Sequence, residues 1–204
     1  MKIAALVLAA GRSSRMGGAH KLLADLGGAP LIARVVGHVA ASRAAPIVVV
    51  TGHQRDEVIA AASRSGAGFD EVYNPDFADG MASSLRAGLL ALPEDCDGAL
   101  VALGDMPLIG AEVFDRLIAE AEARPAASAI VPTVEGSWAH PVLLRQSLFA
   151  EIMALSGDTG ARPLLARRDD VATLAFDDAA LLLDADDPVA LARLEEEWAL
   201  RNER

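Results

Sequence analysis

Short apolar runs alternate with segments of helical periodicity over the first two thirds of the chain. Apolar residues fill consecutive positions in five short runs, as they do in strands buried on both faces, at residues 3–9, 47–51, 72–73, 99–103 and 129–131. Between these runs, apolar residues recur every three or four positions, which predicts helices over residues 30–43, 57–64, 82–92 and 110–123. This alternation predicts βαβ units around a mainly parallel sheet.

After about residue 132 the regular alternation stops. The pattern there predicts strands at 140–144, 171–175 and 181–183, and helices at 146–155, 160–167 and 188–200. No repeat or low-complexity linker marks a second domain. We therefore expect one α/β domain over residues 1–204, with three layers, a Rossmann-like topology and a mixed, mainly parallel sheet.

Composition narrows the classes of partner. Hydrophobic residues make up 52% of the chain and aromatic residues only 4%, so the core must consist mainly of Ala, Val, Leu and Ile. A formal charge of -11 argues against nucleic acid as a partner, because phosphate backbones are bound by clustered positive charge. The apolar run at 3–9 is far shorter than the ~20 residues that cross a membrane. Since a charged turn rather than a cleavage site follows it, we expect a cytoplasmic protein.

The loop after the first predicted strand, residues 9–21, combines glycines with positive charge. Gly11 lets backbone amides approach an anion, and Arg12, Arg15 and Lys21 add cations within the same loop. The loop is neither a P-loop nor a dinucleotide fingerprint, because Met16 and Ser13 stand where those motifs require glycine. We expect it to bind phosphate.

Lysine usage singles out one residue of this loop. The chain has 16 arginines but only two lysines, Lys2 and Lys21. A lysine beside a Gly-rich loop in such a chain suggests a site that needs a compact point charge, although chance would also explain it.

A second loop, residues 74–86, enters a predicted helix with hydroxyl side chains. Ser83 or Ser84 could simply cap that helix. Alternatively, these hydroxyls and the free amides of the helix could bind a base edge or a phosphate.

Carboxylates follow two predicted strands. Asp105 stands at the end of a buried strand, where a carboxylate is costly unless a cation meets it, and Mg²⁺ on phosphate oxygens would do so. The alternative is that Asp105 caps the next helix. Downstream, Asp184 or Asp186 could complete the metal site, whereas Asp187 could cap the last helix.

Together these segments resemble the molybdenum cofactor nucleotidyltransferases, within the Rossmann-like group of MobA-like NTP transferases. The resemblance rests on LAAGRSSRMG, NPDFADGMASSLRAGL, ALGDMP, HPVLL, SGDTGAR and LLDADDP, which occur in the family's order and extend nearly from end to end. The cytidylyltransferases are the best match, since guanylyl members usually carry Gly at the position of Ala10 and a Gly-Pro-Leu-Ala-Gly turn at residues 80–85.

The resemblance implies roles for individual residues. Residues 1–110 would form the nucleotide-binding half, and residues 111–204 the acceptor-binding half with the C-terminal helix. The implied catalytic residues are Arg15, Lys21 and Asp105. The implied nucleotide-binding residues are Ala9, Ala10, Gly11, Arg12, Ser13, Lys21, Asn74, Gly80 and Ser84. The implied acceptor-binding residues are His140, Asp158 and Arg162, and the implied Mg²⁺ ligands are Asp105 and Asp186.

The implied reaction is transfer of CMP from CTP to the phosphate of molybdopterin, with Mg²⁺ as cofactor and pyrophosphate as product. A molybdenum enzyme or its maturation chaperone is a candidate protein partner. Three departures from the family pattern are His20, where Asp is frequent, Ala139, where Gly is usual, and Asp187, where Thr is usual. The alternatives are a sugar phosphate or another phosphorylated acceptor, and a nucleotide-binding delivery protein without turnover.

Overall fold

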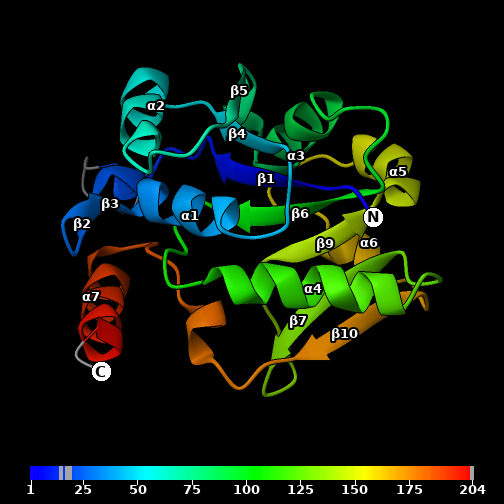
Figure 1. Ribbon diagram of the computed structural model, residues 1–204. Helices are drawn as coiled ribbons and strands as arrows, with labels where there is room; N and C mark the ends of the chain where they lie inside the picture. The colour runs from blue at the N-terminus through cyan, green and yellow to red at the C-terminus, as the bar shows by residue number, and fades with distance from the viewer. Residues whose placement is uncertain (14–15, 17–19, 203–204) are drawn as a thin grey trace.

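The computed structural model describes residues 1–13, 16 and 20–202, and a twisted β-sheet lies at its centre (Figure 1). The sheet strands are β1 (Ile3–Ala9), β4 (Ile47–Thr51), β5 (Asp70–Tyr73), β6 (Gly98–Leu103), β7 (Ala129–Val134), β8 (Ser137–Trp138), β9 (Val142–Arg145) and β10 (Val171–Ala175). Their order in space is β10–β7–β9–β6–β1–β4–β5, with β8 paired to β7. Neighbours in β6–β1–β4–β5 are parallel, whereas β9 is antiparallel to both β6 and β7. The expected mixed, mainly parallel sheet is confirmed.

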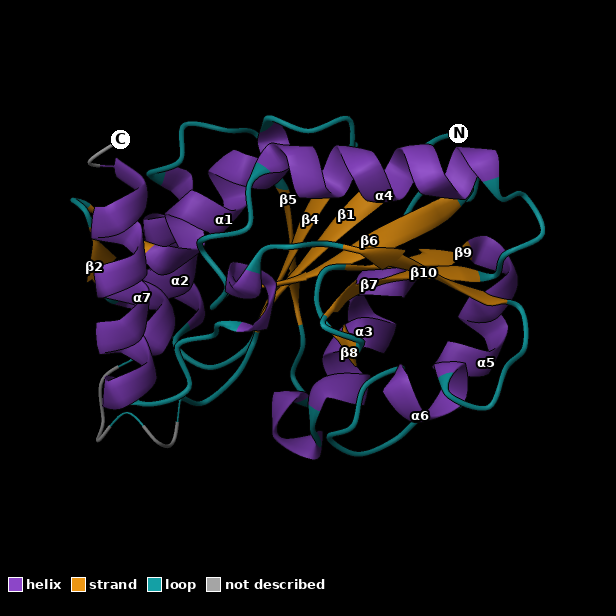
Figure 2. Ribbon diagram, turned by 90° about the horizontal axis from the view of Figure 1, so that it is seen from below, coloured by secondary structure: helices purple, strands orange, loops and turns teal. Residues whose placement is uncertain are grey.

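Helices cover both faces of the sheet. They are α1 (Leu31–Ala40), α2 (Arg55–Ser63), α3 (Met81–Leu90), α4 (Ala111–Ala123), α5 (Phe149–Met153), α6 (Arg162–Leu165) and α7 (Pro188–Asn202). Figure 2 shows α1 and α4 on one side of the sheet and α3, α5 and α6 on the other. All five residues of β4 are buried, with Val49 in the core under α1 and α4 and Val48 in the core under α3. Continuous apolar strands therefore result from burial on both faces.

The sequence pattern fails at residues 181–183, where a strand was expected. These residues belong instead to a 3₁₀ helix, Ala179–Leu182, and the extended residue after it. The Asp178 carboxylate starts this turn by accepting the Ala180 N–H at 3.0 Å. Leu181 is buried, and the sheet already ends at β10, so apolar burial rather than strand pairing explains the leucine run. The expected helix at 160–167 is also shorter, since α6 covers Arg162–Leu165.

The C-terminal segment packs at the end of the molecule toward which β1 and β6 point (Figure 1). Trp198 of α7 lies under the Arg34 guanidinium, whose carbon is 3.7 Å from the ring centroid. A Cβ at Gly27, in the β2–β3 hairpin (Asp25–Leu26 and Ala29–Pro30), would lie 2.3 Å from the Trp198 indole nitrogen. The Ala185 N–H, just before α7, donates to the Asp105 carbonyl at 3.2 Å. The last segment of the chain is thereby fixed beside the end of β6.

Within the described ranges, we find no helix that combines the length and apolar character needed to span a bilayer.

Candidate functional site

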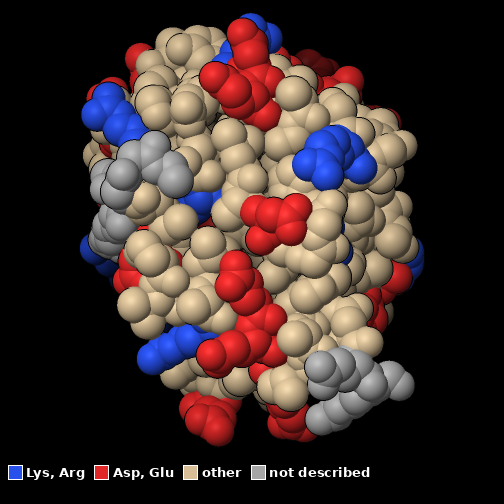
Figure 3. Space-filling model, turned by 90° about the vertical axis from the view of Figure 1, so that its left-hand side faces the viewer, with Lys and Arg blue, Asp and Glu red and all other residues tan. Residues whose placement is uncertain are grey.

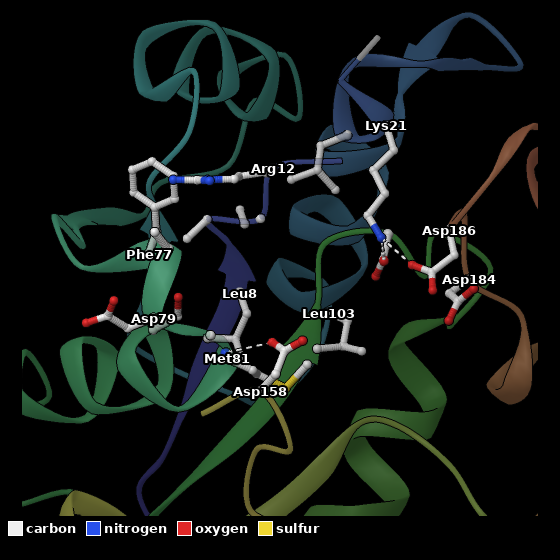
Figure 4. Close-up of a pocket in the computed structure, with 18 of the residues that line it drawn as sticks. Leu8, Arg12, Lys21, Phe77, Asp79, Met81, Leu103, Asp158, Asp184 and Asp186 are labelled. Carbon is white, nitrogen blue, oxygen red and sulfur yellow. Dashed lines mark hydrogen bonds and ion pairs between the residues drawn. The ribbon is translucent and has the colours of Figure 1, made fainter. Parts of the chain in front are cut away.

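A cavity of about 590 Å³ opens where β1 and β6 end, and chain segments from both halves line it (Figure 4). β1 and β6 are parallel neighbours, so the loops after Ala9 and Leu103 leave the same edge of the sheet. Ligands of such sheets bind at this carboxyl edge. The face toward which these strands point carries a band of acidic side chains and fewer, separate basic ones (Figure 3). The polar and charged side chains that line the cavity are Arg12, Lys21, Asp79, Ser84, Asp105, Asp158, Asp184 and Asp186.

Lys21 meets two of the predicted metal ligands. Its ammonium donates to Asp105 Oδ2 and, at 2.7 Å, to Asp186 Oδ1. Burial works against the charged ammonium, but the attraction of Asp105 and Asp186 outweighs it and raises the pKa of Lys21. Three residues expected at one site are thus in direct contact, although the lysine was expected on phosphate.

Asp184 lies next to this group and lines the same cavity. Burial, together with the negative charges of Asp186 and Asp105, raises the pKa of the Asp184 carboxyl. Asp105 does not cap a helix, because α4 begins at Ala111 with Gly110 as its N-cap. Asp187, by contrast, caps α7 by accepting the N–H groups of Val189 and Ala190 at 2.9 and 2.8 Å.

The turn after β1 forms the opposite wall. Ala9, Ala10, Gly11 and Arg12 all line the cavity, and Arg12 places its guanidinium carbon 5.4 Å from the centroid of the Phe77 ring (Figure 4). Arg15, an expected catalytic residue, lies outside the described residues. Ser13 does not line the cavity, but its hydroxyl accepts the Lys21 N–H at 3.1 Å and so fixes the backbone at the lysine.

The loop before α3 is held together by its own polar groups. The buried Asn74 amide donates to Ser83 and Ser84 hydroxyls at 2.8 and 3.0 Å. The Ser83 hydroxyl in turn donates to the Gly80 carbonyl at 2.8 Å, and neither serine caps α3, whose N-cap is Gly80. Gly80 and Ser84 line the cavity, whereas Asn74 does not. Asn74 therefore supports the loop from behind.

The first amides of α3 are not free, contrary to one interpretation of the sequence. The Met81 N–H donates to Asp158 Oδ1 at 3.1 Å, and the Ala82 N–H donates to the Gly157 carbonyl at 3.1 Å. A carboxylate near a helix N-terminus is favourable, which explains why the 157–158 loop closes there. A ligand in the cavity would meet Asp158 rather than the α3 amides.

A second, smaller cavity of about 80 Å³ adjoins the first, and Leu8 and Met81 line both. It contains His140 and Arg162, and the Arg162 guanidinium carbon lies 5.9 Å from the Trp138 ring centroid. His140 Nδ1 is buried with no hydrogen-bond partner in the described part of the chain. The three residues expected at the acceptor are thus divided, since Asp158 lines the large cavity and His140 and Arg162 the small one.

Among the residues that line the two cavities, the sequence analysis missed the aromatic side chains of Phe77 and Trp138, and also Asp79. Aromatic side chains make up only 4% of this chain; Phe77 stands in the 74–86 loop already singled out, and Trp138 stands two residues before His140. That rarity was the available signal, because aromatic rings supply flat apolar walls that Ala and Val cannot. For metal ligation, the described residues contain no cluster of three or more His, Cys, Asp or Glu side chains arranged around one ion.

Buried histidines predict an acid-sensitive fold. Burial lowers the pKa of His20, His38 and His140. The unfolded chain takes up protons below its ordinary histidine pKa of about 6.5, whereas these shielded rings take them up only at lower pH. Their contribution to stability is therefore complete above that pH and declines as pH falls.

We expect the melting temperature to fall between about pH 7.5 and about pH 5.5, above the range where carboxylates protonate. His140→Asn should flatten that slope in thermal melts. A slope identical in wild type and His140→Asn would refute the role given to His140.

Comparison with known proteins places these features in a family. The model of the MobA-like NTP transferase domain matches residues 5–171. A curated relative, the bifunctional protein GlmU of Leifsonia xyli subsp. xyli, is 38% identical over 133 residues. Those residues are 63% of this chain but only 27% of that protein, so the chain spans about a quarter of the relative's length.

Solved structures agree over almost the whole chain. A nucleotidyl transferase from Methanothermobacter thermautotroptrophicus matches with a TM-score of 0.84 and 26% identity, covering 98% of this chain and 99% of the other. Rv0371c from Mycobacterium tuberculosis H37Rv, solved in complex with manganese, matches with a TM-score of 0.79 and 25% identity. That alignment covers 96% of this chain and 99% of the other.

Proposed function

The chain belongs to the MobA-like NTP transferase domain family, and from that premise we propose that it transfers a nucleoside monophosphate from an NTP to a phosphorylated acceptor. The observation that carries the proposal is the meeting of Lys21, Asp105 and Asp186 in the large cavity, opposite the Gly11-Arg12 turn. This arrangement offers positive charge for phosphates and carboxylate oxygens for a metal ion within one cavity. In its specific form, the proposal is a cytidylyltransferase that uses CTP and the phosphate of molybdopterin.

The nucleotide is proposed to lie along the turn after β1. Gly11 leaves the backbone open, since no atom of the described residues lies within 4 Å of where its Cβ would be, so a phosphate can approach closely. Arg12 supplies a planar cation at the rim, and Lys21 supplies a point charge deeper in the cavity. Ala9, Ala10, Gly80 and Ser84 would surround the base and the ribose.

The donor set fits Mg²⁺. Asp105 and Asp186 direct oxygens at the same ammonium, so both can also reach one metal ion there. Mg²⁺ in nucleotide enzymes is usually held by one or two carboxylates together with substrate phosphates and water, so the absence of a larger ligand cluster among the described residues agrees with it. The manganese in the similar structure of Rv0371c supports the proposal of a divalent ion at this site. Bound between these carboxylates and the triphosphate, the ion would offset negative charge on the phosphate oxygens.

The residues suit an in-line displacement. An oxygen of the acceptor phosphate would attack the α-phosphorus, the bond between that phosphorus and the bridging oxygen to the β-phosphate would break, and pyrophosphate would leave. The nucleophile is already ionised, so no general base is needed. Catalysis then depends on positioning and on neutralising charge, which Arg12 and Lys21 can do from the cavity wall.

The acceptor is proposed to enter from the small cavity. Its lining is mainly apolar, with Trp138 as a flat wall and His140, Thr159 and Arg162 as polar groups. A sugar would need several carboxylate or amide groups for its hydroxyls, whereas a fused heterocycle needs a flat wall and a few polar contacts. This lining favours a pterin-type ring over a sugar phosphate.

A panel of nucleotides and acceptors tests the function. Molybdopterin cofactor and representative sugar phosphates would each be combined with the four NTPs and Mg²⁺, with product mass and pyrophosphate release as readouts. A cytosine dinucleotide product supports the specific proposal. A nucleotide-sugar product would mean that the acceptor is a sugar phosphate instead of molybdopterin. Nucleotide binding without pyrophosphate release, for every combination of NTP and acceptor, would favour a delivery protein.

Base preference is a separate prediction. Ala10 is buried, and a Cβ on Gly80 would lie 2.6 Å from the Gly157 carbonyl carbon, so the walls near Ser84 are closely set. We expect kcat/KM for CTP to exceed that for GTP by about tenfold or more, equivalent to about 1.4 kcal/mol. Steady-state kinetics with a single acceptor measures this ratio. Equal use of both nucleotides would contradict the cytidylyl assignment.

A further inference from the structure

Lys21 occupies the position that the metal proposal reserves for a cation. Its ammonium contacts Asp105 Oδ2 and Asp186 Oδ1, and the side chains are 15%, 12% and 42% exposed for Lys21, Asp105 and Asp186. Asp184 adds a third carboxyl beside them. Without a positive charge here, neighbouring carboxylates would repel one another in a partly desolvated site.

The ammonium and a metal ion cannot share these two oxygens. The Lys21 nitrogen lies 2.7 Å from Asp186 Oδ1, within direct hydrogen-bond contact. A magnesium ion bound to these same two oxygens at about 2.0 to 2.1 Å would overlap the position of the ammonium. A metal ion that arrives alone must therefore displace a lysine held by two carboxylates, and it offers the lysine no new partner.

A nucleotide changes this balance because its phosphates offer Lys21 another anion. Lys21 and the Gly11-Arg12 turn line the same cavity. The Lys21 backbone is fixed through its N–H to Ser13 Oγ, whereas its four-carbon stem has rotatable bonds. The ammonium can then move from carboxylates to phosphate while the loop backbone keeps its place.

We propose that Lys21 is an exchangeable counter-ion: it fills the metal position in the nucleotide-free protein and moves to the triphosphate when metal and nucleotide arrive together. The inference rests on the proposed function of this site. It predicts a binding order, in which free divalent metal binds weakly and metal–nucleotide binds well. It also gives Lys21 two opposite effects on binding. Lys21 weakens the binding of a metal ion alone and strengthens the binding of a metal ion together with a nucleotide.

Manganese binding to the nucleotide-free protein tests the first effect, with free Mn²⁺ followed by its electron paramagnetic resonance signal. We expect Lys21→Met to bind Mn²⁺ about tenfold more tightly than wild type. Arg12→Met is the matched control, since it removes a cation from the same cavity that has no hydrogen bond to Asp105 or Asp186 among the described residues. It should change Mn²⁺ affinity by less than about twofold. Adding Asp105→Asn to Lys21→Met should remove the gain.

A measurement on the wild type does not depend on how the variants fold. The chain has only Lys2 and Lys21, so ¹³Cε labelling of lysine gives two signals, which Lys21→Met assigns. We expect Mg²⁺ alone to leave the Lys21 signal in place, and Mg²⁺ with CTP to shift it while the acceptor is absent. A Lys21 signal that shifts with Mg²⁺ alone would overturn the exchange.

The outcomes separate this inference from the proposed function. If wild type binds Mn²⁺ with CTP but Lys21→Met shows no gain without CTP, the exchange is wrong and the function stands. If Arg12→Met gains as much as Lys21→Met, general charge explains the effect and the exchange is again wrong. If no form binds Mn²⁺ with or without CTP, the exchange is wrong and the metal-dependent function is also wrong.

Discussion

Asp105→Asn should lower turnover by about 100-fold or more while leaving the fold intact. Asparagine keeps the shape of the side chain and its capacity for hydrogen bonds but removes the charge. The Asp105 carboxylate is the proposed metal ligand on the β6 side of the cavity, so its loss would weaken charge neutralisation on the triphosphate. Pyrophosphate release measured against Mg²⁺ concentration, with circular dichroism as the check on folding, gives the result.

The ion pair between Lys21 and Asp105 also determines how Asp105→Asn changes the stability of the metal-free protein. From the sequence, an unpaired Asp105 would have been a burden in metal-free buffer, and its removal a gain. The structure pairs Asp105 with Lys21, and a neutral side chain at 105 would leave Asp186 as the one carboxylate hydrogen-bonded to the ammonium among the described residues. We therefore expect the metal-free melting temperature of Asp105→Asn to fall rather than rise, because a half-buried ammonium loses a partner.

Asp186→Asn provides the companion test. It should reproduce the loss of turnover, and the double variant should lose less than the product of the two single losses, because both carboxylates serve one ion. Multiplicative losses would indicate two independent roles. Wild-type activity in Asp105→Asn would remove the metal site from the proposal altogether.

Lys21→Ala should reduce kcat/KM by about 100-fold or more, the range for losing one preorganised electrostatic contact. Lys21→Arg should restore only part of the activity, because a planar guanidinium cannot take the place of a compact ammonium on the triphosphate. Single-turnover kinetics with CTP separates nucleotide binding from the chemical step. Full activity in Lys21→Arg would refute the argument that this site needs a point charge.

Sequence periodicity predicted the parallel half of the fold well because the local pattern and the tertiary burial agree there. β1 and β4 coincide with the expected strands, since strands buried on both faces produce continuous apolar runs. The run at 181–183 has similar composition, but it does not pair with the sheet: Leu181 joins the main core, and Leu183 packs beside the C-terminal helix. Which surface a short apolar run meets is a tertiary property that a local pattern does not contain.

In the candidate site, too, the sequence predicted which residues take part but not how they contact one another. Sequence motifs identified Lys21, Asp105 and Asp186, because a charged residue beside a buried strand or a glycine turn is unusual by itself. They did not predict that the lysine would lie on the carboxylates. Nor did they separate Asp158 from His140, which depends on how the 157–158 loop closes over α3. Contacts between loops from opposite halves are set by the folded chain.

The spacing of the site along the chain makes ligand binding a reporter of complete folding. Lys21 is separated by 84 residues from Asp105 and by 165 from Asp186, and α7 with its Trp198–Arg34 contact fixes the last of them in place. A chain still emerging from the ribosome, or one with a detached C-terminal helix, presents only part of the cation position. Nucleotide with metal would then select the finished native state and stabilise it by mass action, with little benefit to partly folded forms.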